Sequence, residues 1–211
     1  MRKPQKPFAQ SFFLLAITGL FTILFGCTLT SHAQAPVPDS PQIEAKAHAL
    51  VARLTLEEKI VMLGGVDSMF THAVPSINLP RFKMSDASVG VRTWGPTTAY
   101  AGGVALAASW DPVLARRIGE GLARDARARS VHFLLGPGVN IARSPLAGRN
   151  FEYLSEDPFL NSALVVPYIE GVQSQGVIAT VKHYALNNQE YNRHNVSSDV
   201  DERTMREIYL P

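Results

Sequence analysis

Residues 131–183 contain a strand, a helix and a second strand, and they read VHFLLGPGVNIARSPLAGRNFEYLSEDPFLNSALVVPYIEGVQSQGVIATVKH. The apolar run VHFLL (131–135) predicts a strand that ends at the Gly-Pro-Gly turn 136–138. The Asp-Pro pair at 157–158 predicts a helix start, because aspartate caps a helix N-terminus and proline is tolerated in the first turn. VIATV (177–181) predicts the next strand. This order is typical of the βα units that build a parallel sheet.

The same alternation continues on both sides of this segment. Upstream, RFKMS (81–85) predicts a short strand, and an Asp-Pro start at 111–112 opens a helix with apolar residues along one face. Downstream, DERTMREIYLP (201–211) predicts another helix. Nearer the N-terminus, Ser40 and Thr55 are candidate N-caps of two more helices. The sequence therefore predicts an α/β fold with a parallel sheet.

The N-terminus predicts an export signal over residues 1–35. MRKPQK is positively charged, residues 12–29 are apolar without a charge, and small residues follow. Cleavage after Ala33 fits this pattern, whereas LFGC ending at Cys27 is similar to a lipoprotein signal, and an uncleaved membrane anchor is a third interpretation. A proline-rich linker at 36–41 follows. We expect an exported protein, periplasmic or secreted, whose membrane contact is limited to a lipid on Cys27.

The charge pattern argues against a nucleic-acid partner. The formal net charge is +2, but Arg2, Lys3 and Lys6 belong to the predicted signal, and without them 17 basic residues face 18 acidic ones. No basic stripe remains on the rest of the chain. The chain also has no G-x-G-x-x-G or Walker A sequence, so no motif points to nucleotide binding.

Polar residues gather at the predicted carboxyl ends of the strands. Asp86 ends the first strand, a long loop with Arg149 follows the second, and Lys182 and His183 end the third. An amide-rich segment that contains Arg193 comes next. Carboxyl ends of parallel strands meet at one edge of a sheet or barrel, where active sites lie. These side chains therefore predict a pocket for a polyhydroxylated ligand.

Each of these residues also has a structural interpretation. A carboxylate such as Asp86 accepts two hydroxyl hydrogen bonds, but it also caps turns. The planar donor fork of Arg149 suits sugar hydroxyls, and the alternative is a salt bridge to Glu152 or Glu156, with Glu152 as the favoured partner. Successive strand residues point to opposite faces. An unusual backbone at Lys182 is therefore expected if the lysine and the histidine after it are to reach one site.

Metal and serine chemistry find less support. His183, His194, Asp199 and Asp201 offer zinc ligands, but their spacing matches no established pattern, and no H-E-x-x-H occurs. The chain lacks the G-x-S-x-G of a serine hydrolase. We expect no metal and no cofactor.

Three motifs give the chain a family resemblance. From about Ser40 to Pro211 it resembles the N-terminal domain of glycoside hydrolase family 3, the β-glucosidase and β-xylosidase family. The resemblance rests on MSDASVGVR (84–92), GPGVNIARSPLAGRNFEYLSEDP (136–158) and VKHYALNNQEYNR (181–193), in this order. It implies the N-terminal part of a (β/α)8 TIM-like barrel, and a retaining β-glycosidase that hydrolyses terminal non-reducing β-linked glucose or xylose from oligosaccharides or glycosides.

The resemblance also implies which residues hold the substrate. By matching position, the side chains that bind the hydroxyls of the non-reducing-end sugar in the −1 subsite are Asp86, Arg149, Lys182, His183 and Arg193. The family's mechanism needs no cofactor, and the implied partner is a β-linked oligosaccharide or glycoside.

Two departures from the family pattern matter. The family commonly has Asp-Gly-Pro in the first motif, whereas Ala87 and Ser88 follow Asp86 here. Retaining hydrolysis needs two carboxyl groups about 5–5.5 Å apart. The family takes its nucleophile from a later Ser-Asp-Trp motif and its acid/base from a second domain, and neither motif occurs in this sequence. We therefore expect residues 42–211 to be a partial, incomplete barrel domain and the chain to be an N-terminal fragment that is inactive alone.

Two rival interpretations remain open at this point. One is a non-catalytic, exported sugar-binding half-barrel that keeps the sugar contacts without the chemistry. The other is a purely structural exported α/β module in which the three motifs only close loops.

Overall fold

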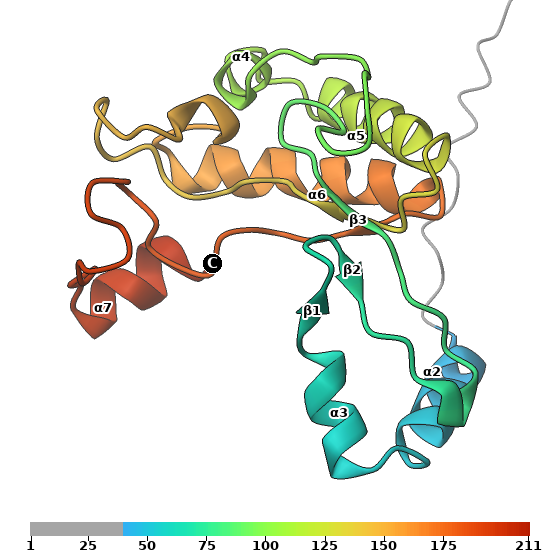
Figure 1. Cartoon of the computed structure of the whole chain (residues 1–211). Coiled ribbons are helices and arrows are strands. Elements are labelled where there is room, and N and C mark those ends of the chain that lie inside the picture. Colours follow the sequence, from blue (N-terminus) through green and yellow to red (C-terminus); the bar gives the residue numbers. More distant parts are fainter. Residues whose placement is uncertain (1–39) are drawn as a thin grey trace, which may run out of the picture. The chain divides into compact units, whose positions relative to one another are not determined.

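The computed structural model describes residues 40–211, which are drawn in colour in Figure 1. The predicted signal at 1–35, with Cys27, and residues 36–39 of the predicted linker lie outside the described residues. Within residues 40–211, no helix has both the length and the apolar character that a bilayer crossing requires.

The described chain consists of short strands and helices, and from β3 onward each strand is followed by one or two helices. The helices are α2 (Pro41–Val51), α3 (Leu56–Met62), α4 (Gly103–Ala107), α5 (Pro112–Arg127), α6 (Pro158–Ser174) and α7 (Glu202–Thr204). The strands are β1 (Gly65–Val66), β2 (Phe70–Thr71), β3 (Met84–Asp86), β4 (Phe133–Leu135) and β5 (Ile178–Ala179). Single helical turns are η1 (Pro75–Ile77), η2 (Asn150–Glu152) and the π-helical η3 (Met205–Tyr209).

A three-stranded parallel sheet lies at the centre of the fold. Its strand order is β3-β4-β5, with Ser85 opposite Leu134 and Leu134 opposite Ala179. The parallel pairing continues past the strands, because an isolated bridge joins Gly138 to Lys182. The prediction of an α/β fold with a parallel sheet is confirmed, and its three strands fit the start of the barrel that the family resemblance implied.

The strands are shorter than their apolar runs suggested. Of VHFLL only Phe133–Leu135 are in β4, and of VIATV only Ile178–Ala179 are in β5. The hydrogen bonding nevertheless extends beyond β5, since the Thr180 N–H donates to the carbonyl oxygens of Leu134 and Gly136. The chain therefore stays aligned with β4 up to the point where the polar segment begins.

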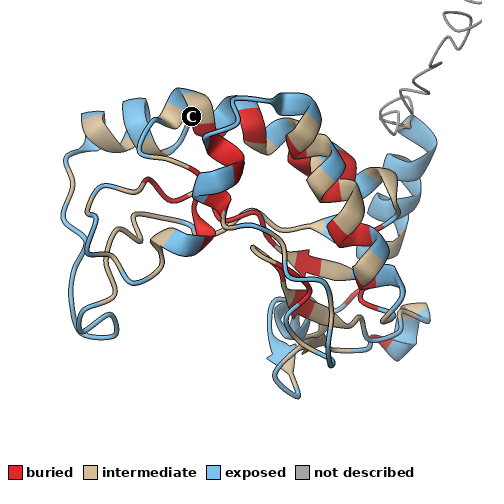
Figure 2. Ribbon diagram, turned by 90° about the horizontal axis from the view of Figure 1, so that it is seen from above, coloured by how far each residue is buried: buried red, intermediate tan, exposed pale blue. Residues whose placement is uncertain are grey.

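The two long helices pack against each other and close the core, as Figure 1 shows. Asp111 and Asp157 cap α5 and α6 as predicted, each accepting backbone N–H bonds from the first turn. The buried residues concentrate where these helices face one another and the sheet (Figure 2). The core side chains from α5, α6 and β4 are Ala115, Leu122, Ala123, Ala126, Leu164, Tyr168, Val172 and Leu134.

The region before β3 differs from the α5–α6 layer. Ser40 and Thr55 cap α2 and α3 as predicted, and Thr55 forms a capping box with Glu58. Neither helix has a buried residue. An antiparallel hairpin of β1 and β2 follows, which the sequence did not predict because each strand has only two residues. A strand this short leaves no period-2 pattern to detect.

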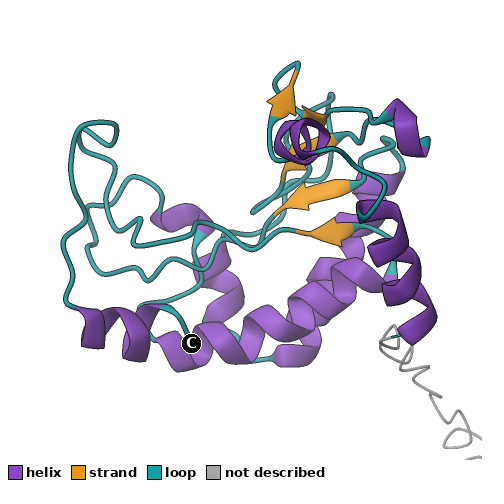
Figure 3. Ribbon diagram, turned by 90° about the horizontal axis from the view of Figure 1, so that it is seen from below, coloured by secondary structure: helices purple, strands orange, loops and turns teal. Residues whose placement is uncertain are grey.

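Long loops follow the three parallel strands. Figure 3 shows how much of the chain beyond the strands is loop. The loops run from β3 to α4, from β4 to α6 and from β5 to α7. Because parallel strands place their carboxyl ends at the same edge, these loops come together, and they carry most of the polar residues singled out above.

We predict that the α5–α6 contact tolerates no added side chain at Gly171. A Cβ at this position meets the carbonyl oxygen of Arg116 at 2.2 Å, and that oxygen belongs to helix backbone. The Gly171→Ala variant should therefore lower the free energy of unfolding by about 1–3 kcal/mol or more, the range typical of overpacking. Chemical denaturation of the two proteins measures this difference.

Gly64→Ala is the matched control. Its Cβ meets only the carbonyl oxygen of Val61 at 3.5 Å, an ordinary contact, and the residue is exposed. Its unfolding free energy should stay within about 0.5 kcal/mol of the wild type. Equal effects at Gly64 and Gly171 would show that the helix backbones do not approach as described.

Candidate functional site

A hollow of about 450 Å³ opens at the carboxyl ends of the parallel strands. Its charged lining residues are Asp86, Arg92, Arg149, Glu152, Lys182, Glu190 and Arg193. They come from the end of β3, from the loops after β3 and β4, and from the segment after β5. Four of the five residues predicted to bind the sugar are therefore brought into one hollow, from positions as far as 107 residues apart.

Lys182 lies between two carboxylates. Its Nζ is 3.0 Å from Oδ1 of Asp86 and 3.3 Å from Oε2 of Glu152. Asp86 also forms an ion pair with Arg92 through its other oxygen. An ammonium group has three donors; one donates to Asp86, and Glu152 adds an ion pair in the described part of the chain. One N–H of Lys182 therefore stays available to a ligand.

Arg149 is held by Glu152, the partner that the structural interpretation favoured. The Nε of Arg149 forms the ion pair, and the same atom is 3.8 Å from Oε1 of Glu190. The alternative partner Glu156 is exposed instead. Since these contacts use Nε, the two terminal guanidinium nitrogens keep donors for a ligand.

Arg193 returns to the same hollow, as the sequence suggested. Its Nη1 is 3.0 Å from Oε2 of Glu190, so Glu190 lies between Arg193 and Arg149. The Arg193 side chain is about half exposed, with a relative accessibility of 47%. It forms the open rim of the hollow, whereas Lys182, at 13%, forms the floor.

Glu152 is the most deeply buried charge of the site. Burial by itself would raise the pKa of its carboxyl group, but the hydrogen bond from Arg149, the charge of Lys182 and the hydrogen bond from Ser88 outweigh burial and lower this pKa. Glu152 is therefore ionised at neutral pH. The sequence indicated it only as a salt-bridge partner of Arg149, because its contact with Lys182 spans thirty residues of chain.

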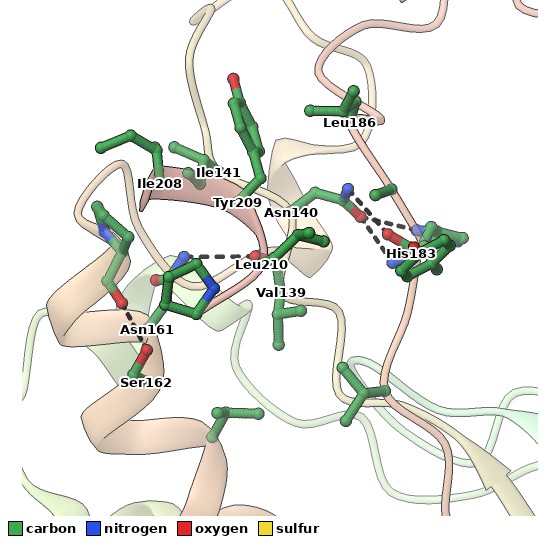
Figure 4. A pocket seen from close by; sticks show the side chains of 16 residues that line it. Val139, Asn140, Ile141, Asn161, Ser162, His183, Leu186, Ile208, Tyr209 and Leu210 are labelled. Atoms are coloured by element: carbon green, nitrogen blue, oxygen red, sulfur yellow. Dashed lines mark hydrogen bonds between the residues drawn. The ribbon is translucent and has the colours of Figure 1, made fainter. Parts of the chain in front are cut away.

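His183 lies on a neighbouring hollow of about 330 Å³, shown in Figure 4. The peptide bond between Lys182 and His183 is cis. The imidazole ring of His183 packs edge-on against Tyr153, with 6.1 Å between the ring centroids. The Nδ1 atom of His183 is 3.1 Å from Oδ1 of Asn140. Burial, together with the positive charges of Arg149 and Lys182, lowers the pKa of His183. The imidazole is therefore neutral near pH 7.

Three residues of this region were not singled out by sequence reasoning. Arg92 and Glu190 stand in the motifs that were quoted, but nothing in their spacing gave them a partner. Asn140 is buried although it is polar, and it is the residue that contacts His183. An asparagine just after a strand end is too common in turns to be a signal by itself.

The arrangement suits a neutral ligand with many hydroxyl groups. The four cations donate hydrogen bonds, and the three carboxylates accept them. Each hydroxyl group can do both, so it can join a donor to an acceptor. Among residues 40–211, no group of three or more His, Cys, Asp or Glu side chains is placed to hold a metal ion.

Comparison with known protein families gives a match over nearly all of the described chain. The profile described as "Glycosyl hydrolase family 3 N terminal domain" matches residues 43–211. The chain is 45% identical over 173 residues to the thermostable beta-glucosidase B of Acetivibrio thermocellus, which covers 76% of this chain and 23% of that protein. It is 44% identical over 193 residues to beta-glucosidase BoGH3A of Bacteroides ovatus, covering 84% and 26%.

Solved structures show the same fold. The GH3 beta-glucosidase of Bifidobacterium adolescentis superimposes with a TM-score of 0.71 at 42% identity, over 76% of this chain and 24% of that one. Beta-glucosidase 3B from Thermotoga neapolitana, in complex with glucose, gives 0.71 at 38% identity, over 78% and 26%. The chain spans about a quarter of the length of these relatives.

We predict that Glu152→Gln destabilises the protein most strongly above pH 5. A neutral amide leaves Arg149 and Lys182 without their shared counter-charge, and breaking such a pair costs about 2–4 kcal/mol when the cations are partly solvated. Because the folded-state pKa of Glu152 is lowered, its contribution to stability is present above the unfolded value of about 4.3 and is lost as the pH falls through the folded value. Denaturation curves of both proteins between pH 3 and 8 measure this dependence.

Glu156→Gln is the control for this experiment. It makes the same chemical change four residues away, at an exposed position. Its effect should stay within about 0.5 kcal/mol at every pH. A difference between wild type and Glu152→Gln that does not shrink below pH 4 would contradict the assignment of Glu152 as the buried, ionised centre of the site.

Proposed function

The chain belongs to glycoside hydrolase family 3, whose N-terminal domain it matches, and from this premise we propose that it carries the sugar-binding part of a retaining β-glycosidase. The proposed substrates are oligosaccharides or glycosides that end in a non-reducing β-linked glucose or xylose. The observation that carries the proposal is the hollow at the strand ends, in which Lys182 and Arg149 are held by carboxylates and still keep donors for a ligand.

The proposed roles follow from the chemistry of each side chain. Asp86 accepts hydrogen bonds from two hydroxyl groups, since an ionised carboxylate has about four acceptor sites and the contacts with Arg92 and Lys182 occupy two. Lys182 and Arg149 donate to hydroxyl oxygens, and Arg193 does so from the rim. The cavity volume of about 450 Å³ falls within the range of about 300–1,000 Å³ that small-molecule sites occupy.

His183 completes the proposed set from the neighbouring hollow. It is the next residue after Lys182, and its ring contacts Tyr153, the residue next to Glu152. A neutral imidazole exchanges hydrogen bonds with a hydroxyl group without adding charge to the site. The beta-glucosidase structure from Thermotoga neapolitana in complex with glucose supports a monosaccharide as the ligand class.

The catalytic carboxyl groups are not assigned to this sequence. A retaining enzyme needs a nucleophile and an acid/base on opposite sides of the glycosidic bond. In this proposal both come from polypeptide other than these 211 residues, and the part described here holds the sugar. The proposal includes export to the periplasm or beyond, directed by residues 1–35, either in soluble form or with a lipid on Cys27.

The first test is binding of D-glucose or D-xylose to the chain and to its Arg193→Ala variant. A charge-assisted hydrogen bond contributes about 1.5–3 kcal/mol, so loss of Arg193 should weaken binding at least about tenfold. Arg193 is half exposed and pairs only at the rim, so its removal should leave the fold intact. Isothermal titration calorimetry or ligand-observed NMR measures the affinity.

Arg206→Ala is the matched control for this test. Arg206 is also exposed and also pairs with a glutamate nearby in the sequence, Glu202, but it does not line the hollow. Its loss should leave sugar affinity unchanged. Equal affinity in the wild type, Arg193→Ala and Arg206→Ala would contradict the sugar site, and so would the absence of any sugar binding.

A second prediction concerns turnover. The 211-residue chain should not hydrolyse an aryl β-glucoside, because neither of the two catalytic motifs occurs in it. Release of the aryl group, followed by absorbance, measures this with a complete β-glucosidase as the positive control. Turnover above the no-enzyme rate that scales with protein concentration would show that this sequence contains its own nucleophile.

A further inference from the structure

Asn140 contacts His183 at three points, two on the backbone and one on the ring. The His183 N–H donates to Oδ1 of Asn140 at 2.8 Å, and Nδ2 of Asn140 donates to the carbonyl oxygen of His183 at 3.3 Å. The ring Nδ1 of His183 lies 3.1 Å from the same Oδ1. Figure 4 shows these contacts, and the Asn140 residue is only 5% exposed.

The two backbone contacts fix which way the Asn140 amide points. A backbone N–H can only donate, so the atom that it meets must be the amide oxygen. A backbone carbonyl can only accept, so the atom facing it must be the amide nitrogen. Both contacts agree on one orientation of the Asn140 amide. In the flipped orientation the amide NH₂ would face the His183 N–H, and the amide oxygen would face the His183 carbonyl oxygen.

This orientation determines the proton on the His183 ring. The amide oxygen of Asn140 has no hydrogen to donate. An unprotonated Nδ1 at 3.1 Å would place two lone pairs against each other, so Nδ1 must carry the hydrogen. The hydroxyl of Tyr153 is farther from Nδ1, at 3.4 Å, so the closer amide oxygen of Asn140 is the contact that decides the protonation of Nδ1.

Burial and the neighbouring cations keep His183 neutral. Burial contributes most to its lowered pKa, and the cations Arg149 and Lys182 lower it further, whereas Glu152 has the opposite effect. A neutral imidazole has one N–H and one lone pair. With the hydrogen on Nδ1, the lone pair is on Nε2.

We propose that Asn140 is a positioning residue that fixes His183 as the Nδ1–H tautomer, so that His183 offers Nε2 as a neutral hydrogen-bond acceptor to a ligand hydroxyl group. The ligand being a sugar rests on the proposed function, whereas the tautomer does not. The consequence for specificity is that His183 requires a hydroxyl hydrogen at its position, while Lys182 and Arg149 require an oxygen lone pair at theirs.

The pairing beyond β4 and β5 brings Asn140 near His183, although the two are not register partners. The bridge between Gly138 and Lys182 aligns the two segments, and the Val139 N–H donates to the Lys182 carbonyl at 2.7 Å. Asn140 follows Val139 and His183 follows Lys182, so this hydrogen bond brings the two residues together. The tautomer is therefore set by a contact that the sheet itself aligns.

The test is nitrogen NMR of the full chain labelled with ¹⁵N-histidine, near pH 7.5. Long-range ¹H–¹⁵N spectra distinguish a protonated ring nitrogen from an unprotonated one, and His183→Gln identifies the His183 signals by their loss. We expect Nδ1 in the protonated range and Nε2 in the unprotonated range. An Nε2–H tautomer, or a ring with both nitrogens protonated, would overturn the proposal.

Two variants test whether Asn140 is the cause. Asn140→Ala should move His183 toward the Nε2–H tautomer that imidazole favours in water, and should weaken glucose binding about three- to tenfold, the loss of one neutral hydrogen bond. Asn140→Asp keeps the acceptor oxygen, so Nδ1 should stay protonated while the added charge raises the pKa of His183. It also covers the case in which Asn140→Ala does not fold.

Asn161→Ala is the matched control. Asn161 is equally buried at 5%, but it hydrogen-bonds to Ser155 and to the carbonyl of Val139 and makes no hydrogen bond to His183. The His183 spectrum should not change in this variant. An unchanged tautomer in Asn140→Ala, or the same change in Asn161→Ala, would contradict the positioning role.

The outcomes separate this inference from the proposed function. An Nδ1–H spectrum without any glucose binding would leave the role of Asn140 in place and contradict the sugar site. Glucose binding with an Nε2–H spectrum would support the sugar site and contradict the inference.

Discussion

The buried carboxylate of Glu152 is the constraint on which the site depends. An ionised group that is removed from water costs several kcal/mol unless it is paired and hydrogen-bonded. Glu152 finds its partners on three different loops: Ser88 after β3, Arg149 after β4 and Lys182 after β5. These loops cannot separate without exposing or unpairing this charge. The carboxylate thereby holds together the residues that face the ligand, although it need not contact the ligand itself.

The sheet makes this convergence possible. Parallel pairing continues beyond β4 and β5, since the Lys182 N–H donates to the carbonyl of Pro137 at 3.0 Å. The loop from β4 and the segment after β5 therefore leave the sheet side by side. Behind them, α5 and α6 pack with their backbones in contact at Gly119 and Gly171, where an added Cβ would meet a carbonyl oxygen at 2.3 Å and 2.2 Å. A rigid layer thus supports a site built from loops.

Local signals in the sequence predicted more of this structure than long-range contacts did. The Asp-Pro starts of α5 and α6 were predictable because a cap depends only on residues two or three positions away. The convergence of Asp86 and Lys182 followed from the parallel alternation. The β1–β2 hairpin and the short α4 were missed, because elements of two to five residues carry no period. The importance of Asn140 appears only once the contacts between the segments that follow β4 and β5 are known.

The charges lining the hollow nearly balance, which favours recognition of a ligand by the directions of its hydrogen bonds and not by its net charge. Four cations and three carboxylates line it, so an anionic ligand would gain from the cations but lose to carboxylates a few ångströms away. A neutral polyol meets no such conflict. The ion pairs also hold the side chains of Lys182 and Arg149 in place in the folded protein. Less side-chain conformational entropy is therefore lost when a ligand binds. A site of this kind distinguishes its ligands by where each hydroxyl group points its hydrogen.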